Sequence, residues 1–141
     1  MEQKRDTKVV ADTTSLLFHN KRWEKKSLAQ MKTPRISFAA CFLGEDREKI
    51  VVAGGYTQNR KALDLCELFD IHKNKWEDLP QMNSARVSST IVNCQNKSGA
   101  DNLFVIGGAD ENGTLLDTIE NLEPDSEEWI TLSFSLPAGG I

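Results

Sequence analysis

Short apolar runs alternate with polar turns along most of this chain, and they follow the same order twice. Each copy has a run of small, β-branched and aromatic residues, a wholly apolar run that ends in two glycines, a run that holds a glutamate, and a run that opens on tryptophan. Runs of this length and composition, bounded by turn residues, predict β-strands. The predicted strands span residues 36–42, 50–53, 65–70 and 76–80 in the first copy and 87–92, 103–106, 118–123 and 129–132 in the second. Neither copy shows helical periodicity, so we predict an all-β fold.

The two copies share one register of 53 residues. The residues with this spacing are the tryptophans Trp23, Trp76 and Trp129, the glycine pairs Gly54-Gly55 and Gly107-Gly108, and the glutamates Glu67 and Glu120. A fixed period of this length marks a structural repeat. Four short strands joined by turns predict one antiparallel sheet per copy, and such a sheet needs a similar sheet on each side to bury both of its faces.

An incomplete third copy precedes the two full ones. Leu16, Trp23, Leu28, Met31, Pro34 and Arg35 follow the order of the matching residues in the full copies. We therefore divide the chain into three segments. Residues 1–35 hold a polar N-terminus and the last two strands of an incomplete unit, residues 36–82 form one unit, and residues 83–141 form a second unit with a truncated C-terminal end.

Side-chain chemistry assigns structural roles to the repeated residues. A tryptophan can bury its ring between adjacent sheets while its indole N–H donates to a carbonyl oxygen. Glu67 and Glu120 lie among apolar strand residues, where a carboxylate needs a charged partner or backbone donors. Arg35 and Arg86 are the candidate partners; the alternative is that these arginines line a ligand-binding face.

This pattern resembles the kelch repeat, the blade of kelch β-propellers. The likeness is carried by the Gly-Gly pair after the second strand, by Glu67-Leu68-Phe69-Asp70 and by Trp76 in the first copy, and by their counterparts in the second. The family usually has tyrosine two residues after the glutamate, where this chain has Phe69 and Leu122. The resemblance implies a partial kelch-type propeller of four-stranded antiparallel blades. It also implies a protein-interaction scaffold or adaptor; the alternative is a fragment of a propeller enzyme of the sugar-processing or copper-oxidase type.

The number of blades is too small for a closed ring. Propellers close with about four to eight blades, and this chain supplies about two and a half. Three explanations stay open. The chain is part of a longer propeller, it assembles with itself or another chain, or it is an open array.

The resemblance also suggests where a protein partner would bind. In a propeller, the loops between strands two and three and those between strand four and the next unit lie at one end. The candidate partner-binding residues on these loops are Asn59, Arg60, Arg35, Arg86, Ser88, Asp110 and Asn112.

Composition and charge reduce the number of functions that the chain could have. The chain is 39% hydrophobic and 27% charged, as expected of a globular protein, and no apolar run is long enough for a membrane span. A net charge of −4 argues against general nucleic-acid binding. Three scattered cysteines favour reduced thiols in the cytoplasm. We expect no catalytic residues, no metal and no cofactor.

The charge is unevenly spread along the chain. Residues 1–35 hold nine Lys or Arg and four Asp or Glu, whereas residues 98–141 hold nine acids and no Lys or Arg. The acidic end is either a solvated surface or a site for a basic partner.

Overall fold

The structure, a computed structural model, describes residues 11–19 and 21–137. The polar residues 1–10 and the truncated end at 138–141, both part of the segments predicted from the sequence, lie outside the described residues. The described part contains strands and turns only, so the all-β prediction is confirmed. It contains no helix that could cross a membrane.

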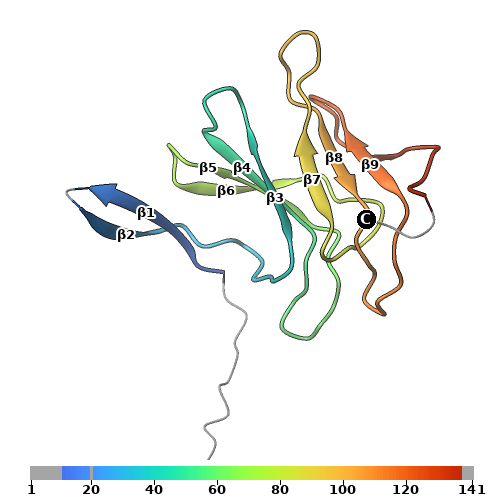
Figure 1. Cartoon of the computed structure of the whole chain (residues 1–141), viewed down its shortest axis with the longest axis horizontal. Helices are drawn as coiled ribbons and strands as arrows, with labels where there is room; N and C mark the ends of the chain where they lie inside the picture. Colours follow the sequence, from blue (N-terminus) through green and yellow to red (C-terminus); the bar gives the residue numbers. More distant parts are fainter. Residues whose placement is uncertain (1–10, 20, 138–141) are drawn as a thin grey trace, which may run out of the picture.

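Ten antiparallel strands form three sheets (Figure 1). A hairpin pairs β1 (Thr13–His19) with β2 (Arg22–Leu28). The first sheet has the order β3 (Ala39–Leu43), β4 (Lys49–Ala53), β5 (Cys66–Asp70) and β6 (Lys75–Leu79). The second sheet repeats this order with β7 (Thr90–Asn93), β8 (Leu103–Ile106), β9 (Ile119–Leu122) and β10 (Ile130–Thr131).

The first strand of each sheet begins later than predicted. The sequence predicted strands from residues 36 and 87, whereas β3 begins at Ala39 and β7 at Thr90. The backbone turns in between, because Ser37 and Ser88 have φ values of 55° and 50°, which lie in the left-handed region and interrupt an extended strand. Strand periodicity alone could not reveal these turns.

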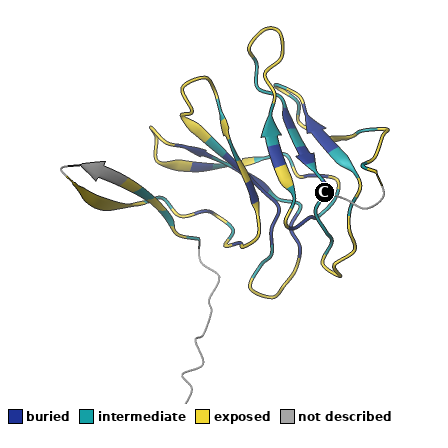
Figure 2. Cartoon of the chain, viewed as in Figure 1, coloured by how far each residue is buried: buried dark blue, intermediate teal, exposed yellow. Residues whose placement is uncertain are grey.

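Two apolar cores connect the three sheets. The larger core lies between the first and second sheets and includes Val51 and Ala53 from one side and Leu103 and Val105 from the other. The smaller core lies between the hairpin and the first sheet, where Leu28 and Met31 meet Trp76. Figure 2 shows the buried positions concentrated in the middle strands of the two four-stranded sheets. Each sheet is therefore stable only against its neighbour.

Strand register places Trp23 differently from the other tryptophans, which corrects its assignment to the repeat. Trp76 lies opposite Phe69, three pairs from the pair Cys66 and Leu79. In the hairpin, the pair Thr13 and Leu28 matches the pair Cys66 and Leu79. Three pairs further along the hairpin, Lys25 occupies the position that Trp76 has in the first sheet. The hairpin is two residues longer on this strand, so Trp23 lies nearer its tip and is 69% exposed.

Candidate functional site

The two repeated glutamates bind the segment that enters their own sheet. Glu67 on β5 pairs with the Nη2 atom of Arg35 and also accepts hydrogen bonds from the backbone N–H groups of Lys32 (2.8 Å) and Thr33 (3.2 Å). Arg35 uses its Nη1 atom to donate to the carbonyl oxygens of Gly54 (3.0 Å) and Leu65 (2.8 Å). One buried carboxylate thus holds residues 32–35 against the sheet that follows them.

The second sheet repeats this arrangement. Arg86 Nη2 lies 2.6 Å from Glu120 Oε1, and Arg86 Nη1 donates to the carbonyl oxygen of Gly107 at 2.8 Å. Glu120 also accepts hydrogen bonds from the backbone of Asn83 (2.6 Å) and Ser84 (3.1 Å). The partnership that the sequence suggested between each glutamate and an arginine is therefore present in both units.

Arg35 and Arg86 do not lie on a partner-binding face. Their relative exposures are 2% and 0%. The Arg35 guanidinium pairs with one carboxylate and donates to three carbonyl oxygens, and the Arg86 guanidinium pairs with one carboxylate and donates to two carbonyl oxygens and the Thr118 hydroxyl. These partners make the buried charges tolerable, although the Nε atom of Arg86 is buried without a hydrogen-bond partner. This corrects the assignment of both arginines to the candidate partner-binding set.

Trp76 and Trp129 make the contact predicted for them. Each indole N–H donates to a backbone carbonyl of the preceding unit, Ala29 at 2.8 Å for Trp76 and Pro80 at 2.9 Å for Trp129. Both rings are buried in the cores between sheets. These contacts tie each sheet to the unit that precedes it.

Two loops at one end of the molecule have the same pattern of backbone hydrogen bonds, and both lie at the lower end in Figure 1. In residues 57–61, Thr57 N–H donates to Lys61 O and Arg60 N–H donates to Thr57 O, both at 3.0 Å. In residues 110–114, Asp110 N–H donates to Thr114 O at 3.0 Å and Gly113 N–H donates to Asp110 O at 3.1 Å. Arg60 (φ 59°) therefore occupies the left-handed position that Gly113 (φ 83°) fills in the other loop.

The Asp110 side chain stabilises its loop. Asp110 Oδ1 accepts hydrogen bonds from the backbone N–H groups of Asn112 (2.8 Å) and Thr114 (2.9 Å). The Thr114 backbone hydrogen bond is the main reason why the pKa of the Asp110 carboxyl lies below its ordinary value. Asp110 is therefore ionised at neutral pH, and its role is to order the loop that displays Asn112.

The remaining candidates lie at the same end of the molecule. Ser88 is exposed, and its N–H donates to Ser37 O at 2.9 Å across the two sheets. Asn59, Arg60 and Asn112 are exposed on the two loops. We call Asn59, Arg60, Ser88, Asp110 and Asn112 the loop face.

Sequence reasoning missed an open groove at the opposite end of the sheets. It has a volume of about 600 Å³ and lies between β3 and β7, lined by Cys41, Phe42, Arg47, Ile91, Asn93 and Gln95 among others. Burial is the main cause that raises the pKa of the Cys41 thiol to about 11, so this thiol is protonated at neutral pH and is a poor nucleophile. The two turns beside the groove differ in sequence between the copies, so the repeat gave no signal for it.

The described residues do not form a metal site. Within residues 11–19 and 21–137, no group of three or more His, Cys, Asp or Glu side chains is placed to hold a metal ion.

Comparison with known proteins agrees with the geometry of stacked four-stranded sheets. The solved structure of YjhT superposes with a TM-score of 0.72 over 92% of this chain and 47% of that chain, at 14% sequence identity. At this identity the likeness shows the fold. Each four-stranded sheet is thus a blade of a β-propeller, and the predicted fold class is confirmed.

Sequence comparison identifies the type of blade. The Kelch motif matches residues 34–83. Similar proteins are Kelch-like protein 41b of Danio rerio (35% identical over 65% of this chain) and the F-box/kelch-repeat protein SKIP30 of Arabidopsis thaliana (29% over 86%). Beta-scruin of Limulus polyphemus is 30% identical over 77% of this chain. The chain belongs to the kelch-repeat family, and it spans only 14% and 30% of the lengths of the first two relatives.

Proposed function

We propose that this chain is a protein-interaction scaffold and that its partner binds the loop face. The observation that carries the proposal is the backbone of Arg60, an arginine in the left-handed position that its counterpart Gly113 occupies without strain. A residue with a Cβ atom loses about 1–2 kcal/mol in this conformation. Backbone strain of this kind clusters at active sites and ligand-binding sites.

The Arg60 side chain has no structural task in the described part of the chain. It is exposed, and no hydrogen bond or ion pair ties it to the described residues. Arginine is also enriched among the residues that dominate protein–protein interfaces. A guanidinium that is displayed at a cost in stability and left without an internal partner is suited to an external carboxylate.

The chemistry of the loop face fits a polar protein surface. Arg60 and Lys61 present positive charge on one loop, and Glu111 presents negative charge on the next. Ser88, Asn59 and Asn112 add hydroxyl and amide groups that both donate and accept. The membership of the chain in the kelch-repeat family supports a scaffold role for such a face.

The test replaces Arg60 and uses Arg47 as a matched control. Arg47 is also an exposed arginine in the left-handed region (φ 56°), but it lies on the turn at the opposite end. Tagged wild-type, Arg60→Gly and Arg47→Gly chains are used to capture proteins from cells, and bound proteins are quantified by mass spectrometry. We expect Arg60→Gly to lower capture of the specific partners by about tenfold or more, because interface arginines often contribute 2 kcal/mol or more. Arg47→Gly should leave capture unchanged.

Stability distinguishes lost binding from lost folding. Arg60→Gly relieves left-handed strain, so this variant should unfold at the same temperature as the wild type or higher. Arg47→Gly relieves the same strain but also removes a guanidinium that lies 5.8 Å from the centre of the Phe42 ring, so its loss of stability should stay within about 1 kcal/mol. The same captured proteins at the same levels with Arg60→Gly, or equal losses with both variants, would contradict the assignment of the partner to the loop face.

A further inference from the structure

Two loops of the loop face lie in equivalent positions on adjacent blades. Residues 57–61 connect β4 to β5, and residues 110–114 connect β8 to β9, so each loop joins the second and third strands of its own sheet. Both loops are therefore complete within this chain, and both lie at the lower end in Figure 1. We call residues 57–61 the first loop and residues 110–114 the second loop.

The two loops have the same backbone conformation. In the first loop, the Thr57 hydroxyl oxygen accepts a hydrogen bond from the Lys61 N–H at 3.2 Å. In the second loop, Asp110 Oδ1 accepts the equivalent hydrogen bond from the Thr114 N–H at 2.9 Å. The backbone hydrogen bonds that close the two loops are equivalent as well. The protein therefore displays side chains from the same backbone twice.

The side chains that these loops display carry opposite charges. Arg60 and Lys61 give the first loop two positive charges and no negative charge. Asp110 and Glu111 give the second loop two negative charges and no positive charge. The backbone hydrogen bond from Thr114 is the main cause that keeps the pKa of the Asp110 carboxyl below its ordinary value, so this carboxylate is ionised at neutral pH. One end of the molecule thus holds a basic loop on one blade and an acidic loop on the next.

Folding of the loops does not explain this division of charge. Thr57 accepts without a charge the hydrogen bond that Asp110 accepts in the second loop, so the loop conformation needs no carboxylate. Among the described residues, no ion pair or hydrogen bond engages the exposed side chains of Lys61 and Glu111. The charges are therefore available to an external partner.

We propose that the loop face binds a protein segment that carries both charges, with an acidic side chain at the first loop and a basic side chain at the second. This inference rests on the proposed function and adds the charge pattern of the partner. Opposite charges on adjacent loops orient a partner, because a segment placed the wrong way round would bring like charges together. A wholly acidic segment would be attracted by the first loop and repelled by the second.

The uncharged residues of the two loops suit such a segment. Asn59 and Asn112 occupy equivalent positions, two residues after the start of each loop, and both are exposed. An amide side chain both donates and accepts, so each asparagine can bind the backbone of a segment whatever its side chains are. Binding by the asparagines is therefore alike at both loops, and the charges supply the specificity.

Selection from random peptides displayed on phage tests the charge pattern on the full chain. On the wild type, peptides that carry both an acidic and a basic residue should be enriched over the unselected library. Arg60→Glu/Lys61→Glu should abolish the enrichment of acidic residues, because the first loop then repels them. Glu111→Lys should abolish the enrichment of basic residues and leave acidic residues enriched.

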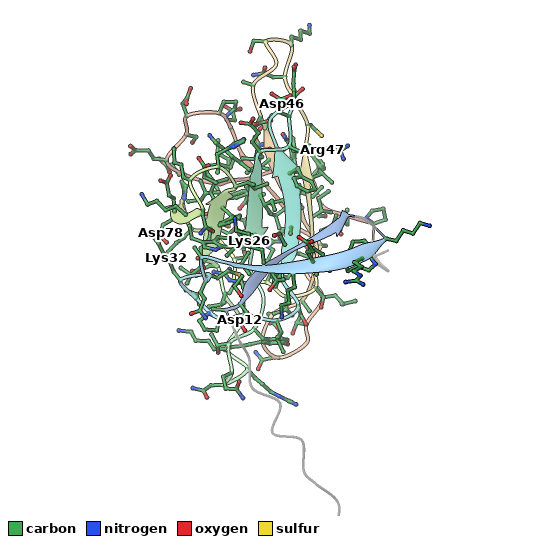
Figure 3. All side chains as sticks on the ribbon, turned by 90° about the vertical axis from the view of Figure 1, so that its left-hand side faces the viewer. Asp12, Lys26, Lys32, Asp46, Arg47 and Asp78 are labelled. Atoms are coloured by element: carbon green, nitrogen blue, oxygen red, sulfur yellow. The ribbon has the colours of Figure 1, made fainter. Side chains whose placement is uncertain are left out.

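Two control variants make the same changes in charge at the opposite end of the molecule. Arg47→Glu/Lys97→Glu matches the variant of the first loop, and Glu45→Lys matches that of the second. All three residues are exposed on the turns that follow β3 and β7. Figure 3 shows Arg47 near the upper end of the molecule, away from the loop face. Both controls should select the same peptides as the wild type.

A selected peptide then measures the second ion pair directly. Fluorescence anisotropy gives its dissociation constant for the wild type and for Glu111→Gln, each with the original peptide and with a peptide whose basic residue is replaced by glutamine. Either change alone should weaken binding by about two- to fivefold, as expected of an exposed ion pair. Both changes together should weaken binding no more than one alone, because each removes the same contact.

The outcomes separate this inference from the proposed function. Peptides that carry acidic residues only, with a selection that Glu111→Lys leaves unchanged, would overturn the charge pattern while the binding face stands. Losses that add up when both changes are combined would also overturn it. A selection that enriches no peptide, or one that Arg60→Glu/Lys61→Glu alters no more than its control does, would contradict the binding face as well.

Discussion

At the scale of single residues, two buried carboxylates determine how consecutive blades join. Glu67 and Glu120 each bind one guanidinium group and two backbone N–H groups of the segment that enters the sheet. Because the segment that is bound precedes the blade in sequence, each carboxylate connects two blades. A charged group in this position is tolerated only while every partner remains in place.

Removing the charge of Glu120 should therefore be costly. We expect Glu120→Gln to lower the free energy of unfolding by about 3–5 kcal/mol, because the substitution leaves Arg86 buried with an uncompensated charge. The control is Glu123→Gln, the same change at an exposed position just after β9, with an expected effect within about 0.5 kcal/mol. Urea unfolding measures both; equal midpoints for the two variants would contradict this role of Glu120.

At the scale of strands and turns, the glycine that follows the second strand of the first sheet allows the next blade to approach. Gly54 has φ 66°, and a Cβ atom there would lie 2.3 Å from the carbonyl oxygen of Arg86. That carbonyl belongs to the residue that enters the second sheet, so the glycine marks a close contact between blades. Gly113 also has a positive φ, but a Cβ atom there would meet nothing within 4 Å.

These two glycines should respond differently to alanine. Gly113→Ala should cost about 1 kcal/mol, from the left-handed backbone alone. Gly54→Ala adds a clash with a backbone atom that cannot move aside, so its cost should exceed that of Gly113→Ala by about 2 kcal/mol or more. Thermal and urea unfolding of the pair provides the measurement, and similar losses for both variants would show that the close approach is dispensable.

At the scale of the whole molecule, stability decreases from the two stacked sheets toward the hairpin. The hairpin meets the rest of the chain through a small core that includes Leu28 and Met31, whereas β4, β5, β8 and β9 are paired on both edges. Local opening requires less free energy where fewer apolar contacts are lost.

Amide hydrogen exchange should follow this gradient. Amides of β1 and β2 should exchange about tenfold or more faster than those of β5 and β8. Mass spectrometry of peptides covering these strands gives the rates. Equal protection of the hairpin and β5 would mean that the hairpin is held by contacts other than those seen here.

Several features were predictable from sequence because they depend on local pattern. The strands of each unit, the repeat and the kelch-type blade follow from apolar runs and from the spacing of Gly-Gly, Glu and Trp. The late start of β3 and β7 was not predictable in this way, because it arises from turns at Ser37 and Ser88 that serve contacts between sheets. The groove beside Cys41 and Phe42 depends on how two sheets meet, which no single stretch of sequence encodes.

By itself, the sequence determined that the chain is a stack of four-stranded blades and which residues repeat in it. Only the tertiary structure decided what those residues do: Arg86 shares the repeat of Arg35 and is buried beside Glu120, whereas Trp23 shares the spacing of Trp76 and is exposed. The physical reason is that burial depends on the neighbouring blade. Two residues at equivalent positions of the repeat have the same surroundings only if each has a neighbouring blade on the same side. In the structure, the hairpin and the second sheet each have one face without a neighbouring blade.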